Sequence, residues 1–421
     1  MSPRSHTASL SAEATGISAT PASSSTRATP PTATLTAAAA PTSLTSSTTP
    51  TLPSGKCSWA PWSSSVCSAR PDMRRAVSLL LILTIAAALT GCGSSASGGT
   101  ELQKFTGYVF EAFDTIISVT AYCESQEDFD RLMETAREDF VRYHRLYDIY
   151  YTYPGMNNLR TVNESAGKAP VEVGEELIGL LDFSLEMYRL TRGRVNVAMG
   201  SVLRIWHAAR EYNNAVPEDQ AYLPDTEELR EAAKHCSIED VVIDREAGTV
   251  FLADGEMSLD VGALAKGYAT ERVAQRLMKD GYGHFVINAG GNVRCCGTKP
   301  GGGSWTVAVT NPGLPGCGES LGTVSVPGGS IVTSGSYQRF FAYDGRRYHH
   351  IIDPDTLMPE DRYLSVTVIT EDSGLADALS TCLFNMDIDE GREFAAGLDG
   401  VEAMWVLPDG EELFSEGFDL K

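Results

Sequence analysis

The sequence predicts an α+β fold, because helical and strand patterns occur together in the same part of the chain. Apolar residues recur at helical spacing over residues 127–147, 175–192 and 266–279. Residues 108–122 alternate as in a strand, and 284–288 form the short apolar run of a buried strand. With 421 residues and 43% hydrophobic content, the chain is long enough to bury a large core.

The elements follow one another in an order that frames a pocket. After the first helix, residues 146–163 form a tyrosine-rich loop that we expect to lie over the pocket, although tyrosine clusters also occur in plain core or surface packing. The helix over 175–192 stops at Gly193, a typical helix end. Residues 195–200 then lead into a helix through Trp206.

The most informative stretch is 258–297. It joins a turn around Gly262, the helix over 266–279, the strand over 284–288 and a second glycine turn. Glycine turns at both ends of a helix and strand are typical of a site that cradles a ligand. Ordinary loop structure is the alternative.

The chain before residue 101 differs in composition. Residues 1–72 are dominated by Ser, Thr, Ala and Pro, so we expect no fold there. A basic start, an apolar run over 77–89 and the sequence Leu89-Thr90-Gly91-Cys92 predict a signal peptide over 73–92 with a lipobox-like end. A membrane-spanning helix is the alternative, but it requires about 20 apolar residues.

These assignments make Cys92 the predicted lipidation site, 93–100 a flexible tether and 101–421 the folded domain. The protein would be lipid-anchored in the cell membrane on its extracytoplasmic side, with more than one acyl chain for stable attachment. Because signal peptides normally begin a chain, the prefix is either a gene-model artefact before a start at Met73 or a genuine disordered extension.

The formal net charge of −22 excludes nucleic acid as a partner, since phosphate backbones are bound by clustered Lys and Arg. The same charge opposes a polyanionic dinucleotide. A site for such a ligand therefore requires a local device, usually a divalent cation together with backbone amides of glycine turns.

The cysteines do not predict a zinc site. The domain has no CxxC pair, and two adjacent thiols are poorly placed to bind one metal. Export permits a disulfide from Cys317 to Cys295 or Cys296, across a strand predicted at 305–310. Buried free thiols are the alternative.

Three blocks of the sequence resemble the ApbE family, the FAD-dependent protein FMN transferases formerly called thiamine-biosynthesis lipoproteins. They are SLDVGALAKG at 258–267, SIVTSGSYQRFF followed by YHHIIDP within 330–354, and GLADALSTCLFN at 374–385. The resemblance covers residues 113–385. It implies one compact α+β domain with mixed sheets and packed helices.

The resemblance also implies the residues that bind FAD. They are Phe113, Tyr150, Arg194, Val195, Asn196, Asp260, Lys266, Ser334 and Ile352. Two departures stand out, since relatives commonly have aspartate in place of Asn196 and Met-Gly-Thr at 113–115. The alternatives are a helix cap for Asp260 and a solvated surface position for Lys266.

Asp377 and Thr381 are the predicted metal ligands. They are four residues apart in a helical stretch and so lie on one helix face, where a carboxylate and a hydroxyl offer Mg²⁺ hard oxygen ligands. The resemblance adds the backbone carbonyl of Ala263. The alternative is a solvated helix start, with Asp377 placed at the positive end of the helix dipole.

His350 is the predicted general base, with His349 as the alternative, and Asp377 acts in catalysis through the metal. Asp353 either orients the histidine or turns the chain before Pro354. The expected reaction transfers FMN from FAD to a Thr or Ser hydroxyl, with AMP leaving.

The implied acceptors are flavoprotein subunits or domains of membrane redox systems with an Asp-Gly-x-(Ser/Thr)-Gly-Ala-Thr-like sequence. No such sequence occurs in this chain. Two other functions stay open: an FAD pyrophosphatase that yields FMN and AMP, and a non-catalytic flavin-binding lipoprotein.

Overall fold

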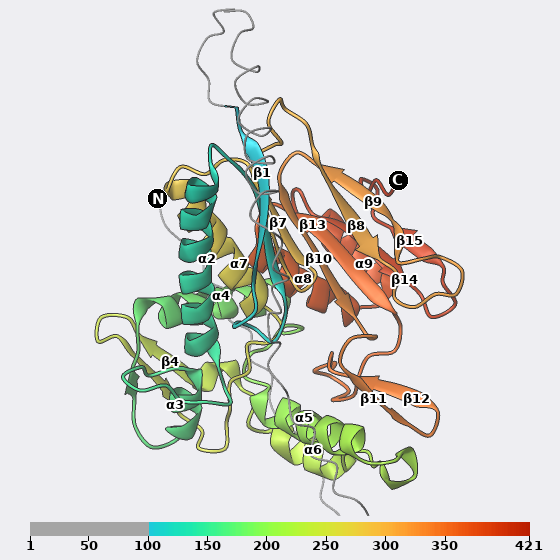
Figure 1. Ribbon diagram of the computed structural model, residues 1–421. Helices are drawn as coiled ribbons and strands as arrows, with labels where there is room; N and C mark the ends of the chain where they lie inside the picture. Colours follow the sequence, from blue (N-terminus) through green and yellow to red (C-terminus); the bar gives the residue numbers. More distant parts are fainter. Residues whose placement is uncertain (1–100) are drawn as a thin grey trace, which may run out of the picture. The chain divides into compact units, whose positions relative to one another are not determined.

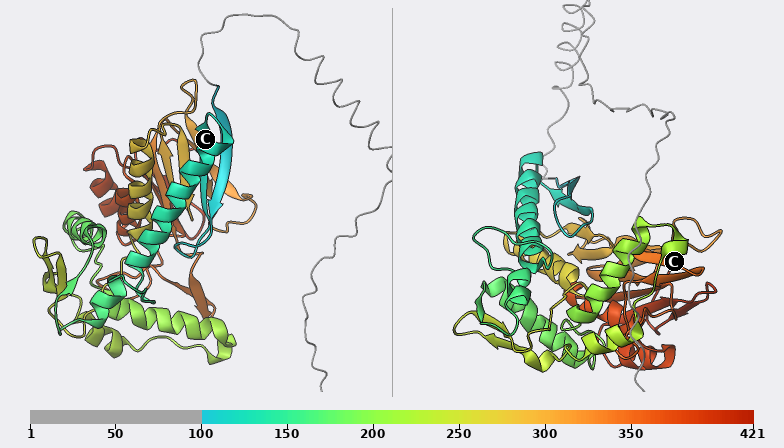
Figure 2. Two further views of the ribbon diagram at one scale, coloured as in Figure 1. Left: turned by 60° about the vertical axis from the view of Figure 1, so that its left-hand side comes forward. Right: turned by 90° about the horizontal axis from the view of Figure 1, so that it is seen from below.

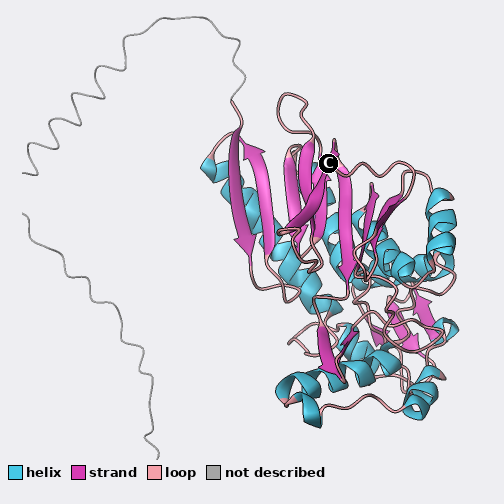
Figure 3. Cartoon of the chain, turned by 90° about the vertical axis from the view of Figure 1, so that its right-hand side faces the viewer, coloured by secondary structure: helices cyan, strands magenta, loops and turns pink. Residues whose placement is uncertain are grey.

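The large sheet is the central element of the computed structural model, which describes residues 101–421 (Figure 1). Its eight strands are hydrogen-bonded in the order β1-β2-β6-β7-β10-β13-β14-β15, and neighbouring strands are antiparallel. Figure 3 shows them side by side. Their bounds are β1 Gln103–Val109, β2 Ile117–Cys123, β6 Phe285–Ala289, β7 Asn292–Cys296, β10 Gly329–Gly335, β13 Ser365–Thr370, β14 Glu402–Val406 and β15 Glu412–Phe414.

Three smaller sheets accompany it, and their pairs are antiparallel too. They consist of β3 (Val171–Glu172), β5 (Thr249–Leu252) and β4 (Val241–Asp244), of β8 (Trp305–Thr310) and β9 (Ser320–Val326), and of β11 (Phe340–Tyr343) and β12 (Arg346–His349). The helices are α2 Gln126–Tyr147, α3 Leu159–Glu164, α4 Glu175–Leu190, α5 Gly200–Ala215, α6 Thr226–Ala233, α7 Ala265–Lys279, α8 Ser373–Phe384 and α9 Ile388–Ala396, with short 3₁₀ turns at Glu218–Gln220 and Ile238–Asp240.

Helices α2, α7 and α8 cover one face of the large sheet. The sheet residues that face them alternate with polar ones: in β2, Ile117, Val119, Ala121 and Cys123 are buried. Figure 2 shows α2 lying along β1 and β2. In this layer α7 lies between α2 and α8, and α8 packs against the strands β10 and β13.

The β8–β9 pair covers the opposite face of the sheet. Trp305 of β8 and Val324 of β9 belong to the same buried cluster as Ile331 of β10. The next residue of β10, Val332, belongs to the main core on the helix side. Neighbouring side chains of one strand therefore fill two different cores, as the period of two requires.

Most predicted elements are confirmed. The helices expected at 127–147, 175–192 and 266–279 are α2, α4 and α7, and the strands expected at 284–288 and 305–310 are β6 and β8. The helix that was expected to run through Trp206 is α5 and continues to Ala215. The α+β class is confirmed, with several sheets and packed helices.

The single strand predicted at 108–122 is wrong, because this segment is a hairpin of β1 and β2. Its connection contains Phe113 and Asp114, both in the left-handed region with φ of 57° and 49°. An alternating pattern does not show where a strand reverses, and this turn lacks the glycine that usually marks one.

The loop predicted at 146–163 is shorter than expected. Its end forms α3, which Asn158 caps by accepting a hydrogen bond from the backbone N–H of Thr161. In the remaining loop, Asp148 accepts hydrogen bonds from the backbone N–H groups of Tyr150 (2.6 Å) and Tyr151 (3.1 Å). This carboxylate fixes the position of Tyr150.

The disulfide between Cys317 and Cys295 or Cys296 is wrong. All six cysteines within 101–421 are free: Cys317 is exposed in the β8–β9 connection, while Cys295 and Cys296 are buried on β7. The alternative of buried free thiols holds for Cys123, Cys295, Cys296 and Cys382. Burial raises the pKa of Cys295 and Cys296 to about 12, so both stay protonated.

The signal peptide, the lipidation of Cys92, the prefix and the tether all lie outside the described residues. Within 101–421, no helix has the length and apolar character that crossing a membrane requires.

Candidate functional site

The site is built where α7 and α8 touch. Gly267 in the first turn of α7 permits this contact, since a Cβ there would lie 2.3 Å from the carbonyl oxygen of Ser373 and 2.5 Å from Cβ of Asp377. The backbone N–H of Gly267 donates to Oδ2 of Asp377 at 2.8 Å. Gly267 is the third residue of α7, where backbone N–H groups have no partner within the helix, and Asp377 satisfies this one. Within 101–421 no backbone N–H donates to the carbonyl of Ala263, which lies in the turn before α7, so its oxygen stays available.

Asp377 is a buried carboxylate with an exposed fraction of only 4%. Burial raises its pKa, while Lys266 and the Gly267 hydrogen bond act in the opposite direction. Nζ of Lys266 lies 3.8 Å from Oδ1 of Asp377. The alternative of a solvated helix start is therefore wrong for Asp377.

We call the space in front of these residues the α8 cavity, with a volume of about 110 Å³. It brings together ten of the predicted site residues, drawn from five separate segments of the chain: Arg194, Val195, Asn196, Ala263, Lys266, Ser334, His350, Ile352, Asp377 and Thr381. Ser334 is held at its edge by a 2.7 Å hydrogen bond between its hydroxyl and that of Ser380 on α8.

His350 lines this cavity, and its Nδ1 is buried without a hydrogen-bond partner. Burial lowers the pKa of His350 to about 3, and the nearby His349, Arg339, Arg210 and Lys266 act in the same direction. The imidazole is therefore neutral at pH 7, with Nδ1 unengaged.

The neighbouring histidine cannot take this role. His349 is 5% exposed; its Nε2 contacts the carbonyl of Glu360 at 2.5 Å, and its Nδ1 accepts from the backbone N–H of Ile351. Asp353 turns the chain, because its Oδ1 accepts from the backbone N–H of Asp355.

A second space, which we call the hairpin cavity, has a volume of about 120 Å³ and adjoins the first at Gly262 and Lys266. Three further predicted residues line it: Phe113, Tyr150 and Asp260. Lys266 therefore lines both cavities, and its side chain is 29% exposed.

Asp260 does not cap α7, whose N-cap is Leu264. Its Oδ1 accepts from the backbone N–H of Gly262 at 2.8 Å, which closes the turn in front of the helix. Burial raises the pKa of this carboxyl, while His207, Arg210 and Arg339 oppose the shift. Because these basic side chains lie near the Asp260 carboxylate, the local charge here is less negative than the net charge of −22 of the whole chain suggests.

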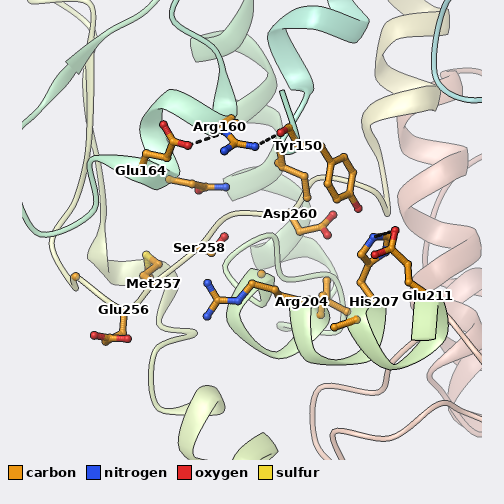
Figure 4. A pocket seen from close by; sticks show the side chains of 16 residues that line it. Tyr150, Arg160, Glu164, Arg204, His207, Glu211, Glu256, Met257, Ser258 and Asp260 are labelled. Atoms are coloured by element: carbon orange, nitrogen blue, oxygen red, sulfur yellow. Dashed lines mark hydrogen bonds and ion pairs between the residues drawn. The ribbon is translucent and has the colours of Figure 1, made fainter. Parts of the chain in front are cut away.

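Tyr150 and Asp260 also border a third, larger space of about 600 Å³, the α5 pocket. Figure 4 shows the two side chains near His207 of α5 at one end of this pocket. The rings of Tyr150 and His207 have their centroids 5.2 Å apart. The aromatic loop thus lies over a pocket, as the sequence predicts.

A family model described as "ApbE family" matches residues 113–405. The chain belongs to the ApbE family. An FAD:protein FMN transferase of Treponema pallidum is 34% identical over 275 residues, which are 62% of this chain and 73% of that protein. An FAD:protein FMN transferase of Klebsiella pneumoniae is 29% identical, over 64% of this chain and 81% of its own length.

The crystal structure of the ApbE protein from Thermotoga maritima has a TM-score of 0.65 and 29% identity to this chain, over 75% of this chain and 97% of that one. The flavin transferase ApbE from Vibrio cholerae has a TM-score of 0.61 at 24% identity, over 76% of this chain and 98% of its own, and so supports the fold.

The structure shows the surroundings of two residues, Asp114 and Asn196, at which this ApbE chain departs from the residues common in its relatives. Asp114 has φ of 49°, a conformation in which a relative's glycine is unstrained and aspartate is tolerated. The amide of Asn196 donates to the carbonyl of Cys236 (3.0 Å) and accepts from the backbone N–H of Ala198 (2.9 Å). These two bonds to the local backbone engage both ends of the Asn196 amide, so fewer of its hydrogen-bonding groups are free to contact FAD than the resemblance implies.

Arg194 is also partly engaged in this ApbE site. Its guanidinium lies 2.9 Å from Asp355 and 3.5 Å from Glu390, while Val195 is buried and donates its backbone N–H to Thr191 Oγ1. Two residues that the sequence did not single out also border these spaces: Arg339 lines the hairpin cavity and His207 the α5 pocket. Arg339 lies in the SIVTSGSYQRFF block, so its position within that motif was the available signal.

Proposed function

We propose that this chain is a Mg²⁺-dependent FAD:protein FMN transferase, which attaches FMN through a phosphoester bond to a Thr or Ser of an acceptor flavoprotein and releases AMP. The observation that carries this proposal is the α8 cavity. It combines an available backbone carbonyl at Ala263, a buried carboxylate at Asp377 and a hydroxyl at Thr381 with the unengaged Nδ1 of His350.

The donor set fits Mg²⁺. All three groups are hard oxygen donors, and the carbonyl of Ala263 accepts no backbone hydrogen bond within 101–421. Mg²⁺ held by these three groups would take its other ligands from substrate and water. When bound, Mg²⁺ neutralises the charge that develops on the diphosphate.

The protein's own residues perform the remaining tasks. Lys266, between the two cavities, places a positive charge beside the diphosphate. The neutral His350 accepts the proton of the attacking acceptor hydroxyl, whose oxygen forms a bond to the FMN-side phosphorus as the bond to AMP breaks. The anionic diphosphate raises the basicity of this imidazole when it binds.

The acceptor class and location extend the proposal. An acceptor in a membrane redox system and a lipid anchor at Cys92 would place enzyme and acceptor on the same extracytoplasmic membrane surface. The flanking sequence Leu89-Thr90-Gly91-Cys92 supports the anchor. Radiolabelled palmitate incorporation that is lost in Cys92→Ala is the expected result.

The deciding experiment mixes the protein with FAD, Mg²⁺ and an acceptor domain that carries an Asp-Gly-x-Thr-Gly-Ala-Thr sequence. Flavin fluorescence is read on a denaturing gel, and AMP is measured in parallel. A fluorescent acceptor band with equimolar AMP, both lost on chelation of Mg²⁺, supports the transferase. AMP without the band supports the pyrophosphatase, and neither product supports a flavin-binding lipoprotein.

A further inference from the structure

One polar group in the α8 cavity has no role in the reaction described above. Six side chains within 101–421 have a buried polar atom without a hydrogen-bond partner, and two of them, His350 and Asn385, line this cavity. The histidine atom is explained by proton transfer. The carbonyl oxygen of the Asn385 side chain, Oδ1, is not.

Asn385 continues the row of oxygen groups on α8. Asp377, Thr381 and Asn385 follow one another at intervals of four residues, so they lie along one face of the helix. Asn385 is the C-cap residue and is 1% exposed. Its Nδ2 donates to the carbonyl of Ile352 at 3.4 Å, which orients the amide and leaves Oδ1 without a donor.

A buried acceptor without a donor from the protein requires a partner from elsewhere, because an unpaired amide oxygen costs free energy. Such groups are uncommon in folded proteins and call for an explanation. Its place in the cavity lining supplies one, since a ligand there can provide the missing donor.

The order of the cavities indicates which part of the ligand reaches Asn385. The hairpin cavity, with Tyr150 and Phe113, meets the α8 cavity at Lys266, and Lys266 lies beside Asp377 at the near end of the row. Asn385 is eight residues further along, about 12 Å at the helical rise. FAD is a linear arrangement of flavin, diphosphate and adenosine. With the flavin near Tyr150 and the diphosphate at Asp377, the adenosine end lies toward Asn385.

We infer that Asn385 recognises the adenine base of the dinucleotide, with Oδ1 accepting a hydrogen bond from the 6-amino group. This inference rests on the proposed function. The amide nitrogen has a second N–H besides the one that donates to Ile352, and a paired donor and acceptor complement the amino group and adjacent ring nitrogen of adenine. Ile352 and Val195, 6% and 2% exposed, supply apolar walls of the same cavity.

The prediction is selectivity against a base with a 6-oxo group. Flavin hypoxanthine dinucleotide has an acceptor where FAD has a donor, so two oxygens would face each other in the buried site. Binding to the wild-type protein, measured by flavin fluorescence titration, is expected to be roughly tenfold or more weaker for this analogue than for FAD.

Two variants separate the contact from general effects on folding. Asn385→Leu should bind both dinucleotides with nearly equal affinity. Ser365→Ala is the matched control, because the Ser365 hydroxyl is also buried and unpartnered but does not line the α8 cavity. It should keep the full preference for FAD. Should Asn385→Leu fail to fold, Asn385→Ala replaces it.

Equal affinity of the wild type for both dinucleotides overturns the inference, as does an Asn385 variant that keeps the preference. The proposed function is tested separately by FMN transfer. If the wild type binds FAD and flavin hypoxanthine dinucleotide equally and transfers FMN from both, the role of Asn385 is refuted and the proposed transferase stands. If it prefers FAD in binding but transfers no FMN, the proposed transferase is refuted.

Discussion

Gly267→Ala tests how the contact between α7 and α8 supports the site. A Cβ at this position would lie 2.3 Å from the Ser373 carbonyl oxygen and 2.5 Å from Cβ of Asp377. Ordinary contact requires at least about 3.4 Å, so the two helices must separate by roughly 1 Å. That displacement lengthens the 2.8 Å hydrogen bond between the Gly267 N–H and Asp377.

The magnitudes for stability and activity differ. Overpacking costs about 1–3 kcal/mol, and alanine regains about 1 kcal/mol of helix propensity relative to glycine. The free energy of unfolding should therefore fall by no more than about 2 kcal/mol. Activity should fall about 100-fold, because a displacement of about 1 Å at a catalytic group has this effect.

The assay pairs urea unfolding with the initial rate of FMN transfer at saturating FAD and Mg²⁺. Gly283→Ala is the control, since Gly283 has no neighbour within 4 Å of a new Cβ and no left-handed φ. It should leave both quantities close to the wild type. A Gly267→Ala protein with wild-type turnover would refute the idea that this contact positions Asp377.

Three other substitutions test the remaining parts of the site. Asp377→Asn should reduce Mg²⁺-dependent transfer by at least about 100-fold and leave the circular dichroism spectrum unchanged; a wild-type rate would remove Asp377 as a metal ligand. His350→Ala should slow transfer about 100-fold or more with little change in the Kd for FAD, and a loss of binding instead would make it a contact residue. Arg294→Ala should lower the free energy of unfolding by about 3–5 kcal/mol in urea, because Glu271, 2.8 Å away, would stay buried without its partner; a loss below about 1 kcal/mol would contradict this.

The buried pair of Arg294 and Glu271 also has a structural consequence for the site. Oε2 of Glu271 accepts from the backbone N–H of Ser373, the first residue of α8. The pair therefore links β7, α7 and the start of the helix that carries Asp377. Neither residue was singled out from the sequence, because a buried ion pair between distant segments has no local pattern.

Local patterns determined much of this protein. The period of apolar residues predicts α2, α4 and α7, and the spacing of four between Asp377 and Thr381 places both on one helix face whatever the tertiary contacts are. The order of three motifs indicates the family. The helices and the shared helix face follow from local sequence, because φ and ψ of a helix or strand fix which neighbouring side chains share a face.

Only the tertiary structure decided which residues meet across the chain. It paired Gly267 with Asp377, 110 positions away, and, within 101–421, left the Ala263 carbonyl without a backbone donor. It gave His349 a contact with the carbonyl of Glu360 and left Nδ1 of His350 without a partner. It also turned the chain back at Phe113, where a continuous strand was predicted, and buried Oδ1 of Asn385. Packing and burial depend on residues that are remote in sequence, so neither the hydrogen-bond partner nor the solvent access of a side chain follows from its local pattern.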